Sequence, residues 1–247
     1  MMTEAIASKE IFLDYLNTRN KGLYCLKLRA LLELGQDCKL DSAYLSHLPP
    51  IGMGSITLVD QVALVLFVKL FKPKRCIEIG TFKGFTTRLL LDNTNNDCEV
   101  VTIDLPSTLT ESMSATDETL ARKNGEYNDE YLTVIQATEG QPHLNGITAA
   151  QLNRLRMVKS DSTTLDFLTE FESAEMVFID GGHSLKIVKA DTENAKKIVN
   201  KGVIVWHDFS SGLHTEVSDY INSLAHSNLV FHIENSLIAF QFINFTK

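Results

Sequence analysis

The chain alternates short apolar runs with amphipathic helical stretches, a pattern typical of a buried parallel sheet covered by helices. Five apolar runs are predicted as strands, and each one is followed by a polar turn: 76–79, 100–103, 156–159, 176–179 and 203–206. Two further runs, Leu229–Ile233 and Leu237–Phe242, flank a polar turn and predict a terminal antiparallel hairpin. The pattern therefore predicts an α/β fold with a mostly parallel sheet of seven strands and helices on both faces.

The N-terminal part differs from this pattern. Residues 9–19 and 22–35 carry leucines and aromatic residues at helical spacing, which predicts two helices. We therefore divide the chain into an N-terminal helical extension or cap, 1–54, and a main domain, 55–247. Within the main domain, residues 106–153 are longer than a usual connection and are interpreted as a lid insertion.

A glycine turn follows the first predicted strand. Gly80 and Gly84 bracket the turn, and a helix is expected to begin at Thr86. This order places backbone N–H groups and a helix N-terminus beside the polar end of a ligand. Three residues separate the two glycines, and no G-K-[ST] ending follows, so a pyrophosphate site is disfavoured. Glu78, just before the turn, favours a cationic or hydroxylated ligand instead.

The stretch Glu-Ile-Gly-Thr-Phe-Lys-Gly-Phe-Thr-Thr, residues 78–87, resembles the first motif of class I S-adenosyl-L-methionine (SAM) methyltransferases. It is closest to the small-molecule O-methyltransferase branch, and the resemblance extends over residues 55–245. It implies a Rossmann-like sheet, SAM as cofactor, and N-terminal helices that cap the cleft or make a homodimer contact. Taken alone, the turn also fits a generic strand-to-helix connection.

Acidic residues end the predicted strands, where ligands bind in an open parallel sheet. Asp104 lies 20 residues after Gly84, and a carboxylate there can accept hydrogen bonds from both ribose hydroxyls or simply cap a helix. The resemblance implies that Asp161 approaches the adenine, although Ser160 stands where the family has glycine. The predicted cofactor-binding residues are Glu78, Gly80, Thr81, Phe82, Gly84, Asp104, Asp161, Ser162 and Asp180.

Two further motifs, Asp180-Gly-Gly-His183 and His207-Asp208, resemble a methyltransferase subgroup that acts on sugars, macrolides and polysaccharide precursors. The resemblance implies that Asp180 and Asp208 bind a divalent metal ion such as Mg²⁺ or Mn²⁺, with His207 as third ligand. It also implies His183 as general base, so His183 and Asp180 are the predicted catalytic residues. Phe209 stands where the catechol-type branch has asparagine. In the alternative interpretation, His207 only packs in the core and Asp208 caps the following helix.

Composition narrows the possible partners and the location. The 247-residue chain has a net charge of −8, which argues against a nucleic-acid partner. Its four cysteines are scattered and fit free thiols in a reducing cytoplasm. The N-terminus lacks a signal-peptide core, and the apolar helix expected at 57–71 is too short to span a bilayer. We therefore expect a cytoplasmic protein without a membrane partner.

The sequence favours a SAM-dependent methyltransferase that methylates a hydroxyl of a small molecule of the sugar, polyketide or other natural-product type. Metal assistance is left open at this point. Two alternatives stay open as well: a metal-dependent, hydroxylase-like relative on the same fold, and a regulatory module that binds SAM without transferring the methyl group. The fold alone does not separate them.

Overall fold

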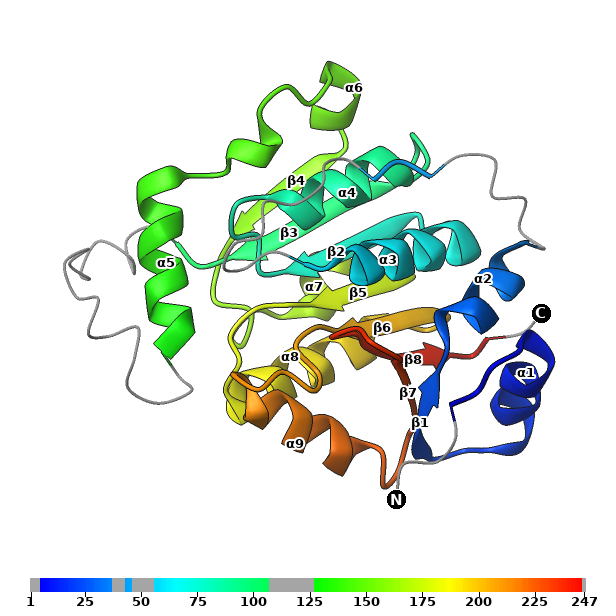
Figure 1. Ribbon diagram of the computed structural model, residues 1–247. Helices are drawn as coiled ribbons and strands as arrows, with labels where there is room; N and C mark the ends of the chain where they lie inside the picture. The colour runs from blue at the N-terminus through cyan, green and yellow to red at the C-terminus, as the bar shows by residue number, and fades with distance from the viewer. Residues whose placement is uncertain (1–4, 37–42, 46–55, 107–126, 246–247) are drawn as a thin grey trace.

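The computed structural model describes residues 5–36, 43–45, 56–106 and 127–245. Its centre is an eight-stranded sheet with the strand order β1-β7-β8-β6-β5-β2-β3-β4. Helices lie on both sides of this sheet (Figure 1). Seven strands run parallel and β8 runs antiparallel to its neighbours β6 and β7. The predicted α/β class, with a parallel-dominant sheet and a terminal antiparallel hairpin, is confirmed.

The strands are β1 (Gly22–Leu26), β2 (Arg75–Ile79), β3 (Glu99–Asp104), β4 (Leu155–Lys159), β5 (Met176–Ile179), β6 (Gly202–Trp206), β7 (Leu229–Ile233) and β8 (Ala239–Ile243). The helices are α1 (Lys9–Thr18), α2 (Leu28–Gln36), α3 (Leu58–Phe71), α4 (Phe85–Asn93), α5 (Tyr127–Glu139), the 3₁₀ turn η3 (Pro142–Leu144), α6 (Ala149–Leu152), α7 (Phe167–Phe171), α8 (Leu185–Ile198) and α9 (Thr215–Leu224).

The prediction of one helix over residues 22–35 is wrong. Its first part is β1, which pairs in parallel with β7 from Gly22↔Leu229 to Leu26↔Ile233. Gly22 has a φ of +121°, which no right-handed helix accommodates. The apolar residues at these positions are compatible with a helix or with a strand. The edge of β7 offers unpaired backbone N–H and C=O groups, and pairing with them favours the strand. The sheet therefore has eight strands instead of seven, and the segment expected to be an appended extension contributes one of them.

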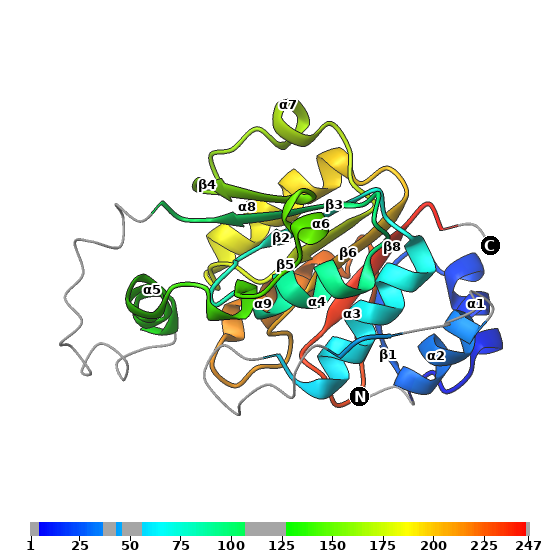
Figure 2. The same ribbon diagram turned by 90° about the horizontal axis from the view of Figure 1, so that it is seen from above.

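Helices cover both faces of the sheet, as Figure 2 shows from above, and an apolar layer lies between each face and its helices. One layer contains buried residues of α2, α3 and α4, and the other contains buried residues of α7, α8 and α9. Successive residues of a strand face opposite sides, so Cys76 of β2 belongs to the first layer and Ile77 to the second. The sheet is therefore fixed from both sides, and the carboxyl ends of its strands form a rigid edge.

The long connection after β3 is described only in part. Residues 107–126 of the predicted lid insertion lie outside the described residues. From Tyr127 onward the chain forms α5, which Figure 1 shows beyond the ends of the central strands. No helix in the described part of the chain has the length and apolar character needed to cross a membrane.

Candidate functional site

A cavity of about 530 Å³ opens at the carboxyl ends of β2, β3, β4 and β5. Its inner wall consists of strand ends and the turns that follow them. Its outer wall is one face of α5, which contributes Asp129, Leu132, Thr133 and Gln136 at helical spacing. A cavity of this size at this edge of a parallel sheet is suited to a nucleoside-sized ligand.

Most of the predicted cofactor residues line this cavity. They are Gly80, Phe82, Asp104, Asp161, Ser162 and Asp180. Asp104 Oδ2 lies 3.2 Å from Lys159 Nζ and accepts a hydrogen bond from Gln136 of α5. Asp161 accepts from the backbone N–H and the hydroxyl of Thr163, at 2.9 and 2.7 Å, so the turn after β4 is held by its own acid.

The glycine turn has the geometry that its sequence predicts. Gly80 has a φ of +98°, and a Cβ there would lie 2.1 Å from the carbonyl oxygen of Asp180. Gly84 has a φ of +80° and caps α4, which begins one residue earlier than expected. The turns after β2 and β5 therefore touch through their main chains, and only glycine fits at position 80.

Glu78, Thr81 and Gly84 do not line the large cavity. Glu78 is 1% exposed, and the hydroxyl of Thr87 donates to its carboxyl group. Burial raises the pKa of Glu78 to about 8, and the threonine hydroxyls that contact it only partly offset this. Its predicted direct contact with the cofactor stays a prediction.

A second cavity, of about 240 Å³, adjoins the first. Residues that line both cavities are Gly80, Phe82, Leu132, Asp180 and His183. The second cavity adds Thr81 together with His207, Asp208 and His214 from the segment after β6. The predicted catalytic residues, Asp180 and His183, therefore stand between the two cavities, and the other predicted metal ligands line the second one.

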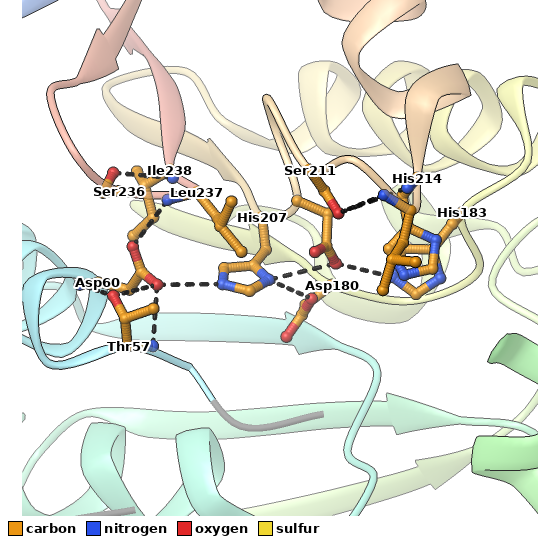
Figure 3. A network of polar contacts seen from close by, with 12 residues as sticks. Thr57, Asp60, Asp180, His183, His207, Ser211, His214, Ser236, Leu237 and Ile238 are labelled. Atoms are coloured by element: carbon orange, nitrogen blue, oxygen red, sulfur yellow. Dashed lines mark hydrogen bonds and ion pairs between the residues drawn. The ribbon is translucent and has the colours of Figure 1, made fainter. Parts of the chain in front are cut away.

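His207 is the centre of a buried network of carboxylates, shown in Figure 3. Its Nδ1 lies 3.1 Å from Asp180 Oδ1 and 3.3 Å from Asp208 Oδ2, and its Nε2 lies 3.4 Å from Asp60 Oδ2. Burial favours the neutral ring, but the three carboxylates outweigh it and hold the pKa of His207 well above its ordinary value. The three carboxylates therefore favour a protonated ring, whose charge balances theirs.

His183 shares Asp208 with this network. Its Nε2 lies 2.9 Å from Asp208 Oδ2, while its Nδ1 and backbone N–H both meet the carboxylate of Asp129 from α5. Burial opposes protonation, yet the two carboxylates raise the pKa of His183 to about 10. The ring stacks on His214 at a centroid distance of 3.6 Å and an angle of 17°.

Two groups of side chains offer three ligand atoms within 4.8 Å of one another: Asp180, His207 and Asp208, and His183, Asp208 and His214. In the second group the two imidazole rings are stacked nearly parallel. A metal ion binds in the plane of each imidazole, and one ion cannot lie in two parallel planes 3.6 Å apart. The first group, which is the predicted set, is therefore the better arrangement for a cation.

Sequence reasoning missed four residues of the site. Asp60 of α3 contacts His207, Asp129 of α5 and His214 both contact His183, and Gln136 of α5 contacts Asp104. None of them lies in a strand-end motif. The only sequence signal was the spacing of Thr57 and Asp60, which fits a helix capping box and gives no hint of a second contact.

Comparison with known proteins identifies the family of the chain. A family model described as a methyltransferase domain matches residues 77–209, more than half of the 247 residues. No curated protein matches the chain.

Among solved structures, the chain is similar to a putative O-methyltransferase from Klebsiella pneumoniae, with 14% identity, coverage of 87% of this chain and 88% of that one, and a TM-score of 0.51. It is also similar to the calicheamicin methyltransferase CalS11, with 13% identity, coverage of 87% and 93%, and a TM-score of 0.50. At these identities the two structures show the fold alone. The family match and the fold together lead to one conclusion: the chain belongs to the methyltransferase domain family and is a class I SAM-dependent methyltransferase.

Proposed function

We propose that this enzyme transfers the methyl group of SAM to a hydroxyl of a small acceptor of the sugar, polyketide or other natural-product type. The cofactor takes the larger cavity and the acceptor takes the smaller one. The observation that carries the proposal is that Asp180 and His183 line both cavities. A group that passes from one ligand to the other does so beside these two side chains. The volume of about 240 Å³ favours a small acceptor.

Residues around the larger cavity suit each part of the cofactor. Asp104 offers a carboxylate to the ribose hydroxyls, and the Asp161–Ser162 turn lies where an adenine would bind. The sulfonium of bound SAM makes its methyl group electrophilic. The protein's task is then to orient the acceptor and to take up its proton.

The cluster of Asp180, His207 and Asp208 fits a divalent cation. Two carboxylates and one imidazole nitrogen lie within 4.8 Å of one another at the wall of the smaller cavity. This mixed set suits a transition metal such as Mn²⁺ better than Mg²⁺, which prefers oxygen ligands alone. A cation held here would lower the pKa of an acceptor hydroxyl.

His183 is placed to hold the proton of the acceptor, but its pKa of about 10 keeps it protonated at neutral pH. Asp208 is one of the two carboxylates that stabilise this charge. If Asp208 binds a divalent cation, its charge stabilises protonated His183 less. The pKa of His183 then falls, and the neutral ring that can accept a proton becomes more populated. Asp208 would then couple binding of a cation to the protonation of His183.

The test begins with the purified protein. We expect S-adenosylhomocysteine to bind in calorimetry, and labelled SAM to methylate at least one member of a panel of sugars, catechols and hydroxylated polyketides. EDTA should abolish transfer, and Mn²⁺ should restore it. Failure to bind the nucleoside would overturn the cofactor site, and transfer that resists EDTA would overturn the cation site. Turnover without SAM would favour a hydroxylase-like enzyme, and binding without transfer would favour a regulatory module.

His183→Ala tests the role of the shared histidine. We expect transfer to fall by at least 10²-fold, as is typical when a general base is removed, while affinity for S-adenosylhomocysteine stays within a few-fold. His226→Ala is the matched control, because His226 is exposed and lies outside both cavities. Unaltered transfer in His183→Ala would rule out its role as base.

A further inference from the structure

Asp60 is a buried carboxylate far from the motifs that define the enzyme. It lies in the first turn of α3 and is 0% exposed. A buried charge is costly unless it is paired and hydrogen-bonded, so each of its contacts needs an explanation.

Part of the explanation is local. Thr57 and Asp60 form a capping box, in which Asp60 Oδ2 accepts from the backbone N–H of Thr57 at 2.9 Å and from its hydroxyl at 2.7 Å. A capping box requires a side chain that reaches back to the cap residue, and it works at the protein surface. It does not require that the acid be fully buried.

The remaining contacts tie Asp60 to two distant segments. Its Oδ1 accepts from the backbone N–H of Leu237, in the turn between β7 and β8, at 3.0 Å. Its Oδ2 lies 3.4 Å from Nε2 of His207, at the end of β6. Figure 3 shows Asp60 between these partners, with His207 leading on to Asp180. These contacts keep the pKa of Asp60 below its ordinary value although burial alone would raise it.

We propose that Asp60 is a positioning residue: it accepts a hydrogen bond from Nε2–H of His207 and thereby turns Nδ1 toward Asp180 and Asp208. The ring is confined on another side by Phe178, at a centroid distance of 6.0 Å and an angle of 66°. Asp60 is itself held by Thr57 and Leu237, so Nε2 of His207 points toward a fixed acceptor. Nδ1, on the opposite side of the ring, then points toward the wall of the smaller cavity. A carboxylate behind a histidine is how proteins fix the ring and the tautomer of a functional imidazole.

Only the role of His207 in the reaction rests on the proposed function. The hydrogen bond between Asp60 and the His207 ring is a property of the protein without ligands. The first readout is therefore the ¹⁵N and ¹H NMR signals of the His207 ring in metal-free protein, and the second is the separation of kcat from the KM for SAM.

Asp60→Asn is the main variant. Backbone N–H groups donate to both carboxylate oxygens of Asp60, Leu237 to Oδ1 and Thr57 to Oδ2, and an amide has only one oxygen to offer them. The variant also removes the negative charge that faces Nε2 of His207. We expect the Nε2–H signal of the wild-type ring to show a hydrogen bond to a carboxylate, and the variant to lose that signature. We also expect kcat to fall about 10- to 100-fold, the usual effect of removing such a partner, with the KM for SAM within about threefold.

Thr57→Val is the matched control, because it breaks the same capping box and leaves the carboxylate of Asp60 beside His207. It should lower the melting temperature yet keep the Nε2–H hydrogen-bond signature and kcat. Asp60→Glu retains the capping box and serves if Asp60→Asn does not fold, since glutamate is common at this cap position but reaches back to Thr57 instead of His207. It should also lose the Nε2–H hydrogen-bond signature.

An unchanged His207 ring in the folded Asp60 variants would overturn the proposal, as would a wild-type ring without the Nε2–H hydrogen-bond signature. A changed ring with unchanged kcat would overturn the functional part. If the wild-type protein transfers no methyl group, the proposed function fails, and the NMR signals still decide whether Asp60 positions His207.

Discussion

The regions around His207 and His183 share Asp208 but differ in how their histidines are anchored. His207 meets Asp60, a fully buried residue of α3 in the first apolar layer. His183 meets Asp129, whose side chain is 32% exposed and belongs to α5, the helix of the long connection. One imidazole is therefore held by the core of the domain, and the other by an element at its periphery.

This difference separates stability from activity. Removing His207 leaves the fully buried Asp60 and the partly buried Asp180 and Asp208 without a counter-charge, which lowers the stability of the fold. Removing the side chain of His183 leaves Asp129, which is already partly exposed and can be solvated. The change therefore affects the rate of the reaction more than the stability of the fold. The predictions below test this separation, starting with the largest expected effect.

His207→Ala should destabilise the protein by about 3–5 kcal/mol, because Asp60, Asp180 and Asp208 lose the cation between them. His183→Ala should cost about 1.5–3 kcal/mol, the scale of hydrogen bonds to charged groups. Urea unfolding of both variants measures the difference. Equal losses would show that the two histidines are anchored alike.

Glu78→Gln extends the comparison to a buried carboxyl group whose hydrogen-bond partner is the hydroxyl of Thr87. The pKa of Glu78 is about 8 in the folded protein and near 4.5 without burial, so the folded state binds the additional proton between these values. Stability is then fully present below pH 4.5 and falls as the pH rises toward 8. Glutamine removes this loss.

Melting curves at pH 5, 7 and 9 test the prediction. Glu78→Gln should resemble the wild type at pH 5 and exceed it at pH 9, by on the order of a few kcal/mol. Thr87 can still donate to the amide oxygen, so the variant keeps the hydrogen bond. A constant gap across the three pH values would mean that Glu78 ionises as it does in the unfolded chain.

Asp129→Asn should reduce kcat about tenfold and change stability by less than about 1 kcal/mol, because it loosens His183 without disturbing the core. Glu139→Gln is the control on the same helix, since it weakens only an ion pair with Lys83. Kinetics and melting curves of both variants give the result. A loss of stability comparable to that of His207→Ala would place α5 with the core instead of the periphery.

The parts of the fold that could be predicted are those whose physical requirements lie within a few consecutive residues. The strands that lead to Gly80, Asp104 and Asp180 are apolar on both faces because helices cover both sides. Gly80 was readable as a turn residue because only glycine tolerates its φ and the carbonyl group beside it.

The parts that could not be predicted depend on contacts between distant segments. Residues 22–26 satisfy a helix or a strand, and only the edge of β7, some 200 residues later, selects the strand. Asp60 reads as a capping residue, since nothing near it in the sequence announces His207 or Leu237. Asp129 and Gln136 lie in a polar stretch without a motif, and their role follows from where α5 lies.

The contact between Gly80 and the carbonyl oxygen of Asp180 has a consequence for how such an enzyme can diversify. The contact joins two loops through main-chain atoms, so substitutions at positions other than Gly80 leave it in place. Under the proposed function, the spacing between the cofactor cavity and the acceptor cavity is then kept while other residues change. Exposed side chains that line the smaller cavity, such as the 68% exposed Leu213, are free to vary and to admit new molecules. A descendant of this enzyme could therefore change its acceptor while it keeps the distance between the two cavities.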